Sequence, residues 1–264
     1  MAISVCALGS GSKGNAILVS GGGHKILIDC GFGIRDLSAR LMSQGVSLAE
    51  LDGVLVTHEH TDHIRAIKSV GDVHGVPIYL HERTCRAIGP AVPENAFVFS
   101  TLNGFRLGGF EIRPFPTSHD AIYPLGYAIS DGESKFVYAT DMGYVTREVF
   151  AAAKGADIVM IESNYDKEML INGSYPYFLK KRILSDHGHL CNTVCAEAVR
   201  QIADWGTKNF ILGHISQENN KKEIVYRTTL EVLEKEGGKL SKDFEIYIAE
   251  QDFPCETVLC RTAG

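Results

Sequence analysis

The sequence lacks any apolar run that approaches the roughly 20 residues needed to span a membrane as a helix. Residues 1–6 carry no basic side chain, as the start of a secretion signal would, and they lead directly into a strand pattern. Low-complexity stretches, charge blocks and long linkers are also missing. These absences favour a cytoplasmic protein that has no membrane partner, and they predict a single domain over residues 1–264.

Cysteine is scarce, and its seven residues at irregular spacings argue against a disulfide framework and for a reducing cytosol. Cys191 and Cys195 would lie one helical turn apart. No second pair accompanies them, so we interpret them as small buried side chains. Basic residues are not in excess either, because the net charge is −6 and the isoelectric point is near 5.9. Composition therefore gives no sign of nucleic-acid binding, although bound cations would add local positive charge that composition omits.

Hydrophobic periodicity predicts an α/β sandwich with helices outside strand-rich layers. Strands are expected at Ile3–Leu8, Ala16–Ser20, Lys25–Asp29, Val54–Thr57, Pro77–Leu80, Phe110–Phe115, Leu125–Ser130, Lys135–Ala139, Asp157–Ile161, Asn209–Leu212, Phe244–Ala249 and Thr257–Cys260. Helices are expected at Ile34–Gln44, His63–Val70, Arg83–Ile88, Arg147–Ala152, Cys191–Asp204 and Lys221–Glu236.

A faint internal repeat accompanies this pattern. Segment 25–31 resembles segment 135–143, since each has a basic residue, a strand, an Asp and a Gly, and a later strand in each half ends in His58 or His214. Coincidence explains so short a similarity equally well. A true two-fold repeat would bring the polar strand ends of both halves to one edge.

Six residues, His58-Glu59-His60-Thr61-Asp62-His63, place three imidazoles and an aspartate directly behind the apolar strand Val54–Val56. A strand that feeds such a loop is typical of a transition-metal site, because these side chains cannot all point into a core. Neutral imidazole nitrogens and a carboxylate suit zinc, manganese or iron. The alternative is a chance cluster in a polar surface loop, and the density of the motif argues against it.

This His-x-His-x-Asp-His motif resembles the signature of the metallo-β-lactamase superfamily, and the later candidate ligands His119, Asp141 and His214 follow in the family's order. The resemblance spans essentially the whole chain. It implies an αββα sandwich of two mixed β-sheets flanked by helices, with two divalent metal ions (Zn²⁺ or Mn²⁺, with Fe or Ni left open). It also implies one ion held by His58, His60 and His119, a second held by Asp62, His63 and His214, and Asp141 between them.

Two positions distinguish branches of that superfamily. Members with Cys at the position of Asp141 include β-lactamases, and Glu in place of His60 would indicate the flavodiiron branch; this chain has neither. A bridging carboxylate with nitrogen and oxygen ligands favours hydrolysis of phosphoesters, thioesters or lactones. Two metals about 3.5–4 Å apart activate water at neutral pH and clamp the oxygens of an in-line displacement at phosphorus.

A candidate proton donor lies in segment 185–193, which resembles the Gly-His segment of the transfer-RNA 3′-processing nucleases. In those enzymes that His acts with a Glu behind a strand, and the matching residues here are His189 and Glu162. A histidine held by a carboxylate protonates a leaving alkoxide, which a ribose or deoxyribose leaving group requires. A helix cap at His189 is the structural alternative.

Two loops are candidates for phosphate binding: the Gly-rich loop 9–15, and the loop 213–220, which leads into a helix whose N-terminus favours an anion. Hairpin turns are the commoner explanation of Gly-rich loops. The triplet Lys180–Arg182 is either a nucleic-acid contact or a solvated face. The candidate phosphate- or substrate-binding residues are Ser10, Ser12, Asn15, Ser185, His187, Asn192, Ser216, Asn219 and Asn220.

Within the superfamily the chain is similar to the YycJ/WalJ (VicX) proteins, in segments 7–15, 27–31, 57–63, 162–166, 185–190 and 216–220. This resemblance implies a cytoplasmic bacterial exonuclease that degrades double-stranded DNA from 5′ to 3′. Cys191 departs from an expected Ser, which would remove a hydroxyl contact near the proposed donor. The chain also lacks a long inserted domain of the kind that RNA-processing relatives use. DNA is the favoured partner, with RNA left open on physical grounds.

Our hypothesis is a dinuclear metal-dependent phosphodiesterase in which Asp62 orients the attacking water while binding metal, and His189, with Glu162, protonates the departing oxygen. The first rival is a thioester or lactone hydrolase of the same fold, which needs no donor for an alkoxide. An RNA-directed nuclease and an inactive metal-bearing scaffold are the others. Seven candidate ligands argue against the scaffold, because four protein ligands close off a purely structural ion. The native metal, the mode of cleavage and the oligomeric state stay open.

Overall fold

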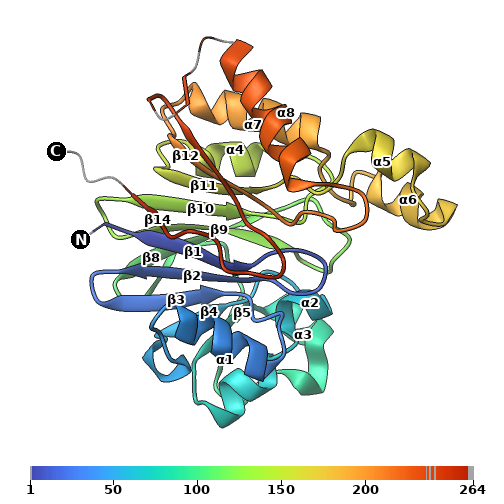
Figure 1. Cartoon of the computed structure of the whole chain (residues 1–264). Helices are drawn as coiled ribbons and strands as arrows, with labels where there is room; N and C mark the ends of the chain where they lie inside the picture. The colour runs from blue at the N-terminus through green and yellow to red at the C-terminus, as the bar shows by residue number, and fades with distance from the viewer. Residues whose placement is uncertain (1, 236, 238, 241, 261–264) are drawn as a thin grey trace.

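The computed structural model describes residues 2–235, 237, 239–240 and 242–260. Two seven-stranded β-sheets lie face to face, with helices α1–α3 outside the first sheet and α4, α7 and α8 outside the second (Figure 1). The predicted αββα sandwich is confirmed. The single domain predicted over residues 1–264 stays a prediction, since Met1 and residues 261–264 lie outside the described part. No helix within the described part is both long and apolar enough to cross a membrane.

The first sheet has the strand order β14-β1-β2-β3-β4-β5-β6. β1, β2 and β3 are antiparallel neighbours, β3 to β6 are parallel neighbours, and β14 pairs antiparallel with β1. The strands are β1 Ser4–Gly9, β2 Ala16–Gly21, β3 His24–Ile28, β4 Gly53–Leu55, β5 Ile78–His81, β6 Ala96–Phe99 and β14 Val258–Leu259.

The second sheet has the strand order β13-β12-β11-β10-β9-β8-β7. β7 to β10 are antiparallel neighbours, and β10 to β13 are parallel neighbours. The strands are β7 Phe105–Leu107, β8 Phe110–Pro116, β9 Leu125–Ser130, β10 Lys135–Ala139, β11 Ile158–Glu162, β12 Asn209–Gly213 and β13 Glu245–Ile248.

The helices follow the parallel strands or connect them. Short 3-10 turns at Leu48–Glu50 and Gly89–Ala91 and a π-helical stretch at Ser69–Val73 complete the secondary structure. The α-helices are α1 Ile34–Ser43, α2 Thr61–Ile64, α3 Glu82–Ile88, α4 Arg147–Ala153, α5 Lys167–Asn172, α6 Tyr177–Ile183, α7 Asn192–Ala203 and α8 Lys222–Lys235.

The core has three apolar layers because side chains along a strand alternate between the faces of a sheet. In β3, Ile26 and Ile28 pack between the two sheets, whereas Leu27 faces the layer that α1 covers. In β10, Phe136 packs between the sheets, and Val137 faces the layer under α4 and α7. Both faces of these central strands are therefore buried, which fixes their register and the positions at which they end.

All twelve expected strands are present within two residues at either end, and five of the six expected helices are confirmed. The helix expected at Lys221–Glu236 is described to Lys235, since Glu236 lies outside the described residues. The helix expected at His63–Val70 is interrupted: α2 ends at Ile64, residues 65 and 66 form a turn, and helical structure resumes before the π-helical stretch Ser69–Val73. The amide of Ala66 donates to the carbonyl of Cys30, and the carbonyl of His63 accepts from the amide of Cys30, so this stretch gives up helical hydrogen bonds. β6, β7, α5 and α6 were not predicted.

The internal repeat has a structural counterpart in part. Strands β1–β6 and β8–β13 have the same succession of two antiparallel and three parallel pairings. The repeated segments fall on β3 and β10, and the aspartates behind them, Asp29 and Asp141, both have a φ of 60°. The pairing of His58 with His214 does not hold, because His58 follows β4 whereas His214 follows β12, the counterpart of β5.

Candidate metal centre

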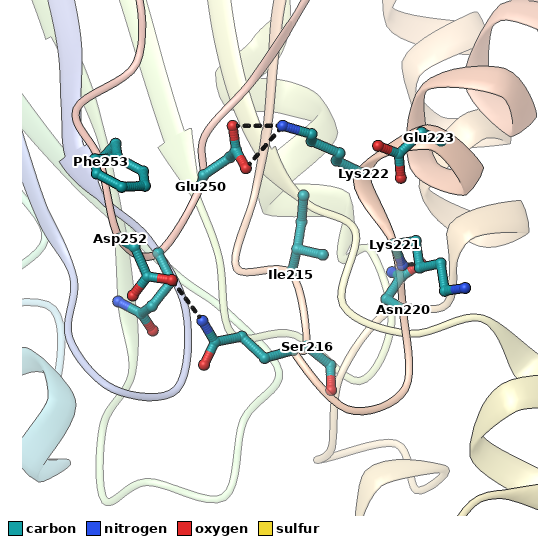
Figure 2. Close-up of a pocket in the computed structure, with 11 residues that line it drawn as sticks. Ile215, Ser216, Asn220, Lys221, Lys222, Glu223, Glu250, Asp252 and Phe253 are labelled. Atoms are coloured by element: carbon teal, nitrogen blue, oxygen red, sulfur yellow. Dashed lines mark hydrogen bonds and ion pairs between the residues drawn. The ribbon is translucent and has the colours of Figure 1, made fainter.

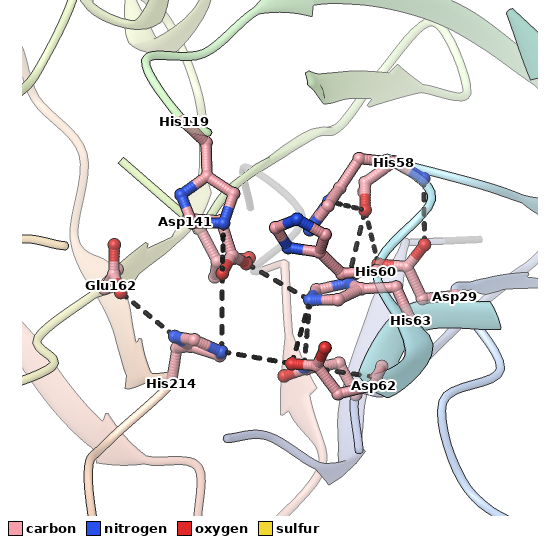
Figure 3. A network of polar contacts seen from close by, with 12 residues as sticks. Asp29, His58, His60, Asp62, His63, His119, Asp141, Glu162 and His214 are labelled. Carbon is pink, nitrogen blue, oxygen red and sulfur yellow. Dashed lines mark hydrogen bonds and ion pairs between the residues drawn. The ribbon is translucent and has the colours of Figure 1, made fainter. Parts of the chain in front are cut away.

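The six-residue motif divides between a loop and the first turn of a helix. β4 ends at Leu55, and α2 begins at Thr61, with His60 extended at the N-cap position (φ −64°, ψ 144°). His58 and His60 therefore project from the loop, whereas Asp62 and His63 project from the helix (Figure 3). One short segment thus points side chains in two directions.

The second sheet supplies the other candidate ligands. His119 follows β8, Asp141 follows β10 and His214 follows β12, so all three come from strand ends at one edge of the sheet. Asp141 and His214 have positive φ values of 60° and 53°. Such conformations cost of order 1–3 kcal/mol for non-glycine residues and persist where surrounding contacts hold them. The amide of Asn164 does so for His214, by donating to its carbonyl at 2.8 Å.

The structure brings all seven predicted ligand side chains together (Figure 3). Nitrogen or oxygen atoms of His58, His60 and His119 lie within 4.8 Å of one another, and so do those of Asp62, His63 and His214. Asp141 lies between the two groups. Its carboxylate oxygens are 3.4 Å from His63 Nε2, 3.4 Å from His214 Nε2 and 3.7 Å from His119 Nε2. This arrangement matches the expected two sites with a shared carboxylate, and the role of each side chain stays a prediction.

The donor atoms fit divalent cations. His58 Nε2 and His214 Nε2 are buried and have no hydrogen-bond partner among the described residues, as lone pairs directed at a metal would be. Negative charge is also concentrated here. Burial alone lowers the pKa of an imidazole, yet the nearby carboxylates of Asp141, Asp62 and Glu162 raise the pKa of His214 to about 10. Imidazole and carboxylate donors suit zinc, manganese and iron. The cluster is therefore a site for divalent metal ions.

Four of the five candidate imidazole ligands, His58, His63, His119 and His214, have a hydrogen bond at Nδ1, which leaves Nε2 toward the centre. His63 donates to Asp29 Oδ2 at 2.7 Å, and His58 donates to the hydroxyl of Thr57 at 3.0 Å. His119 donates to the carbonyl of Gly188 at 3.1 Å. Such contacts fix the tautomer of a metal-binding histidine and raise its basicity.

Asp29 is a functional candidate to which sequence reasoning gave no role. It is fully buried and joins two parts of the motif, because its carboxylate accepts from His63 and from both the amide and the hydroxyl of Thr57, at 2.8 Å each. Its signals in the sequence were its place in the internal repeat, opposite Asp141, and its place in segment 27–31 of the family resemblance. The contact with His63 spans 34 residues and cannot be read from spacing.

We expect Asp29→Asn to weaken Zn²⁺ binding by about 10–100-fold, the range for loss of a carboxylate that supports a ligating histidine. An amide at this position cannot accept from His63 and Thr57 with both of its heteroatoms. Competitive titration against a chelator measures the change. Asp52→Asn is the matched control, because Asp52 also accepts from a histidine (His24 Nδ1, 3.2 Å) but lies before β4, away from the centre. Equal affinity of Asp29→Asn and wild type would contradict this role.

A second pair of groups borders the metal cluster. His189 Nδ1 lies 2.6 Å from Glu162 Oε1, and Glu162 is fully buried at the end of β11. The same oxygen accepts from His214 Nδ1 at 3.0 Å. Burial alone raises the pKa of a carboxyl, but the charge and hydrogen bond of His189 outweigh it and lower the pKa of Glu162. Glu162 is thus an anion that orients one candidate metal ligand and one candidate proton donor at the same time.

Five candidate phosphate-binding residues are buried, and four of them have hydrogen-bonded side chains. Ser10 accepts from the amide of His214 at 2.9 Å and donates to Asn15, whose side-chain amide lies against the motif at 3.2 Å from His63 Nε2. Asn192 and Asn220 are hydrogen-bonded to each other and to the segment behind β11. These side chains hold the loops that carry the candidate ligands. Their contact with phosphate stays a prediction.

The other five candidates lie nearer the surface or at a loop junction. Ser12, Ser185 and His187 are exposed. Ser216 lies in the wall of a pocket between the loop before α8 and the segment 250–253, where Lys222 pairs with Glu250 at 3.0 Å (Figure 2). Asn219 is buried, and its carbonyl accepts from the amide of Asp166. The pocket in Figure 2 therefore has two of the predicted residues, Ser216 and Asn220, on its wall.

Comparison with known proteins agrees with this geometry. A family model described as a beta-lactamase superfamily domain matches residues 24–215. The chain belongs to the metallo-β-lactamase superfamily. It is a hydrolase of this superfamily with a site for divalent metal ions.

Two similar superfamily members cover nearly the whole chain. Exodeoxyribonuclease YycJ of Bacillus anthracis is 35% identical over 258 residues, which are 96% of this chain and 98% of that protein. Exodeoxyribonuclease WalJ of Streptococcus pneumoniae serotype 2 (strain D39) is 34% identical over 251 residues, 93% of each chain. The resemblance stated from the sequence motifs is confirmed.

A solved metallo-β-lactamase fold supports the architecture. The metallo-beta-lactamase fold protein YhfI of Bacillus subtilis superposes with a TM-score of 0.73 at 20% identity, covering 96% of this chain and 99% of that one. At this level of identity the superposition supports the fold alone. The metallo-β-lactamase sandwich thus accounts for the described chain from β1 to β14.

Proposed function

We propose that the protein is a dinuclear metal-dependent phosphodiesterase that degrades double-stranded DNA from the 5′ end. The observation that carries this proposal is the pair of His189 and Glu162, 2.6 Å apart and beside the metal cluster. A nucleotide leaving group departs as an alkoxide of high basicity and needs a proton in the transition state. The two exodeoxyribonucleases that align with nearly the full chain support DNA as the substrate.

The chain's own residues would divide the chemistry between them. Bound Zn²⁺ or Mn²⁺ would supply an activated water and stabilise the charge that develops on the phosphoryl oxygens. Asp62, which is partly exposed, orients the water from the side of α2. His189 donates a proton to the departing oxygen from Nε2, because Nδ1 is held by Glu162. Glu162 keeps the ring in this orientation and stabilises its protonated form.

A thioester or lactone hydrolase is the rival within the same fold. The thiolate that leaves a thioester is a weaker base than an alkoxide and requires less help from an acid, so the His189–Glu162 pair would have no task in thioester hydrolysis. We also propose that the protein works in a reducing cytoplasm. All seven cysteines are unpaired in the structure, which supports this location.

Degradation of end-labelled DNA tests the proposed function. We expect purified protein with Mn²⁺ or Zn²⁺ to shorten duplex DNA labelled at its 3′ end progressively, and a chelator to stop the reaction. Ribonucleotide duplexes and a thioester serve as competing substrates in the same assay. Intact DNA after incubation with metal-loaded protein, together with turnover of the thioester, would reject the proposal.

A further inference from the structure

Helices α5 and α6 form a small arm between β11 and α7. The arm projects beyond the sheets, away from the helices that cover the sandwich (Figure 1). It has its own apolar cluster, in which Leu170 of α5 and Ile183 of α6 pack against Tyr165 and Cys191. The inner faces of both helices are therefore occupied, and the arm is attached to the segments that carry Glu162 and His189.

A second face of the arm is open. Tyr177, Lys180, Lys181 and Leu184 have the i, i+3, i+4, i+7 spacing of one helical face, and together with Ile171 of α5 they line a hollow in the surface. Tyr177 is 81% exposed, Ile171 51% and Leu184 43%. A helical face of this kind usually packs against another element, and here it is left to solvent.

The arm is held firmly beside the metal centre. Arg182 pairs with Asp120, with Nη2 3.1 Å from Oδ1, and the same Oδ1 lies 3.3 Å from His119 Nε2. The returning chain passes so close to Gly143 that an added Cβ there would lie 2.2 Å from the backbone of Asp186. A molecule bound on the open face would therefore lie at a fixed place relative to the candidate metal ligands.

Charge on the open face selects among partners. Lys180 Nζ is held by the carbonyls of Ile171 and Gly173, and it adds positive charge while fastening the arm. Lys181 is exposed and has no ion pair or hydrogen bond with any described residue. No acidic side chain lines the hollow. An aromatic ring flanked by lysines is the combination that binds single-stranded nucleic acid, since a base stacks on the ring and phosphates meet the lysines.

We propose that the open face of the α5–α6 arm binds unpaired nucleotides of the DNA substrate, with Tyr177 as a stacking surface and Lys181 as a phosphate contact. This inference rests on the proposed function, whose substrate it describes more closely. The arm thereby binds the DNA strand next to the end that is being degraded. Its residues contribute to binding, and they take no part in the proton transfer at His189.

Binding of a fluorescent duplex with a single-stranded overhang tests the inference, measured in a His189→Ala background so that DNA is not consumed. We expect Tyr177→Ala to weaken binding by about tenfold, within the range for loss of one base–aromatic stack. Tyr177→Phe should bind as wild type because the ring remains. Lys181→Ala should reduce the salt dependence of log Kd by about 0.7, the share of one phosphate contact on a single strand.

Matched controls separate a local effect from misfolding. Met42→Ala on α1 and Lys208→Ala before β12 remove an exposed apolar and an exposed basic side chain far from the arm, and both should bind as wild type. Hydrolysis of bis(p-nitrophenyl) phosphate, which is too small to reach the arm, should be unchanged in Tyr177→Ala with His189 present. The KM for the overhang duplex should then rise while kcat stays constant.

Two results would overturn the inference. If wild type degrades DNA while Tyr177→Ala and Lys181→Ala bind the overhang duplex with wild-type Kd, the arm has no part in binding and the proposed function stands. If Tyr177→Ala converts a dimer into a monomer at unchanged Kd, the open face is a contact between copies of the chain. Failure of wild type to cleave any nucleic acid would instead remove the proposed function itself.

Discussion

Asp141→Asn is expected to lower DNA hydrolysis by about 1,000-fold or more and to reduce the bound metal from two ions per chain toward one. The carboxylate of Asp141 faces His63, His119 and His214 at 3.4–3.7 Å, so among the described residues it is the one anion common to both groups of candidate ligands. A neutral amide would leave the cations repelling each other without compensation. Loss of about 4 kcal/mol of transition-state stabilisation corresponds to the stated factor.

Activity assays and elemental analysis of the purified variants measure both effects. Asp157→Asn is the matched control, because Asp157 accepts from the amide of Lys135 at the opposite end of β10. It should keep its metal and its activity. A variant at Asp141 that retains two ions and normal turnover would show that the two groups act without a shared carboxylate.

His189→Ala is expected to slow cleavage of DNA by about 10²–10⁴-fold, the usual contribution of general acid catalysis. Metal content should stay at two ions, because His189 is not one of the seven predicted ligands and its Nδ1 is held by Glu162 at 2.6 Å. Hydrolysis of bis(p-nitrophenyl) phosphate should fall much less, because nitrophenolate is a weak base and leaves without a proton. The ratio of the two rates therefore reports the role of the proton donor directly.

Two further variants sharpen the test of His189. Glu162→Gln keeps the shape of the partner but removes its charge. It should slow DNA cleavage and shift the alkaline limb of the pH profile to lower pH, because the carboxylate no longer stabilises protonated His189. His74→Ala removes an exposed histidine on the far side of the first sheet and should have no effect. Equal losses on both substrates in His189→Ala would assign His189 to metal or substrate binding instead of proton donation.

Most of the metal centre could be predicted because short local sequence patterns indicate its chemistry. His58 to His63 are consecutive, and each later candidate ligand follows a strand whose apolar pattern is plain in the sequence. Residues behind parallel strands meet at one sheet edge whatever the intervening loops do. The family resemblance selected His119, Asp141 and His214, and their positions behind strand ends explain why the fold brings them to the motif.

The supporting contacts could not be predicted in the same way. Asp29 reaches His63 across 34 residues, and Arg182 reaches Asp120 across 62, so neither pair has a spacing that a sequence pattern could reveal. The burial of Ser10 and Asn15 also results from contacts between residues that are far apart in the sequence. The Gly-rich loop was a candidate for phosphate binding, and no sequence pattern showed that the side chain of Gln251, 237 residues from Gly14, fastens it.

The α5–α6 arm was not predicted because its helices are short. α5 has six residues and α6 has seven, and neither length establishes a helical period. Local signals were nevertheless present, since Asp166 caps α5 by accepting from the amide of Met169 and Pro176 precedes α6. A cap signal therefore identifies helices that are too short for periodicity to detect.

The matching order of strand pairings in the two sheets bears on how the fold evolved. It is the pattern that duplication and fusion of a gene for a half-length chain would leave. On that view Asp29 and Asp141 descend from one ancestral residue with the same left-handed backbone. One copy came to lie among the donor atoms, and the other became the support of a neighbouring histidine. An ancestral homodimer would have begun with the two copies in identical surroundings, and fusion allowed each to specialise.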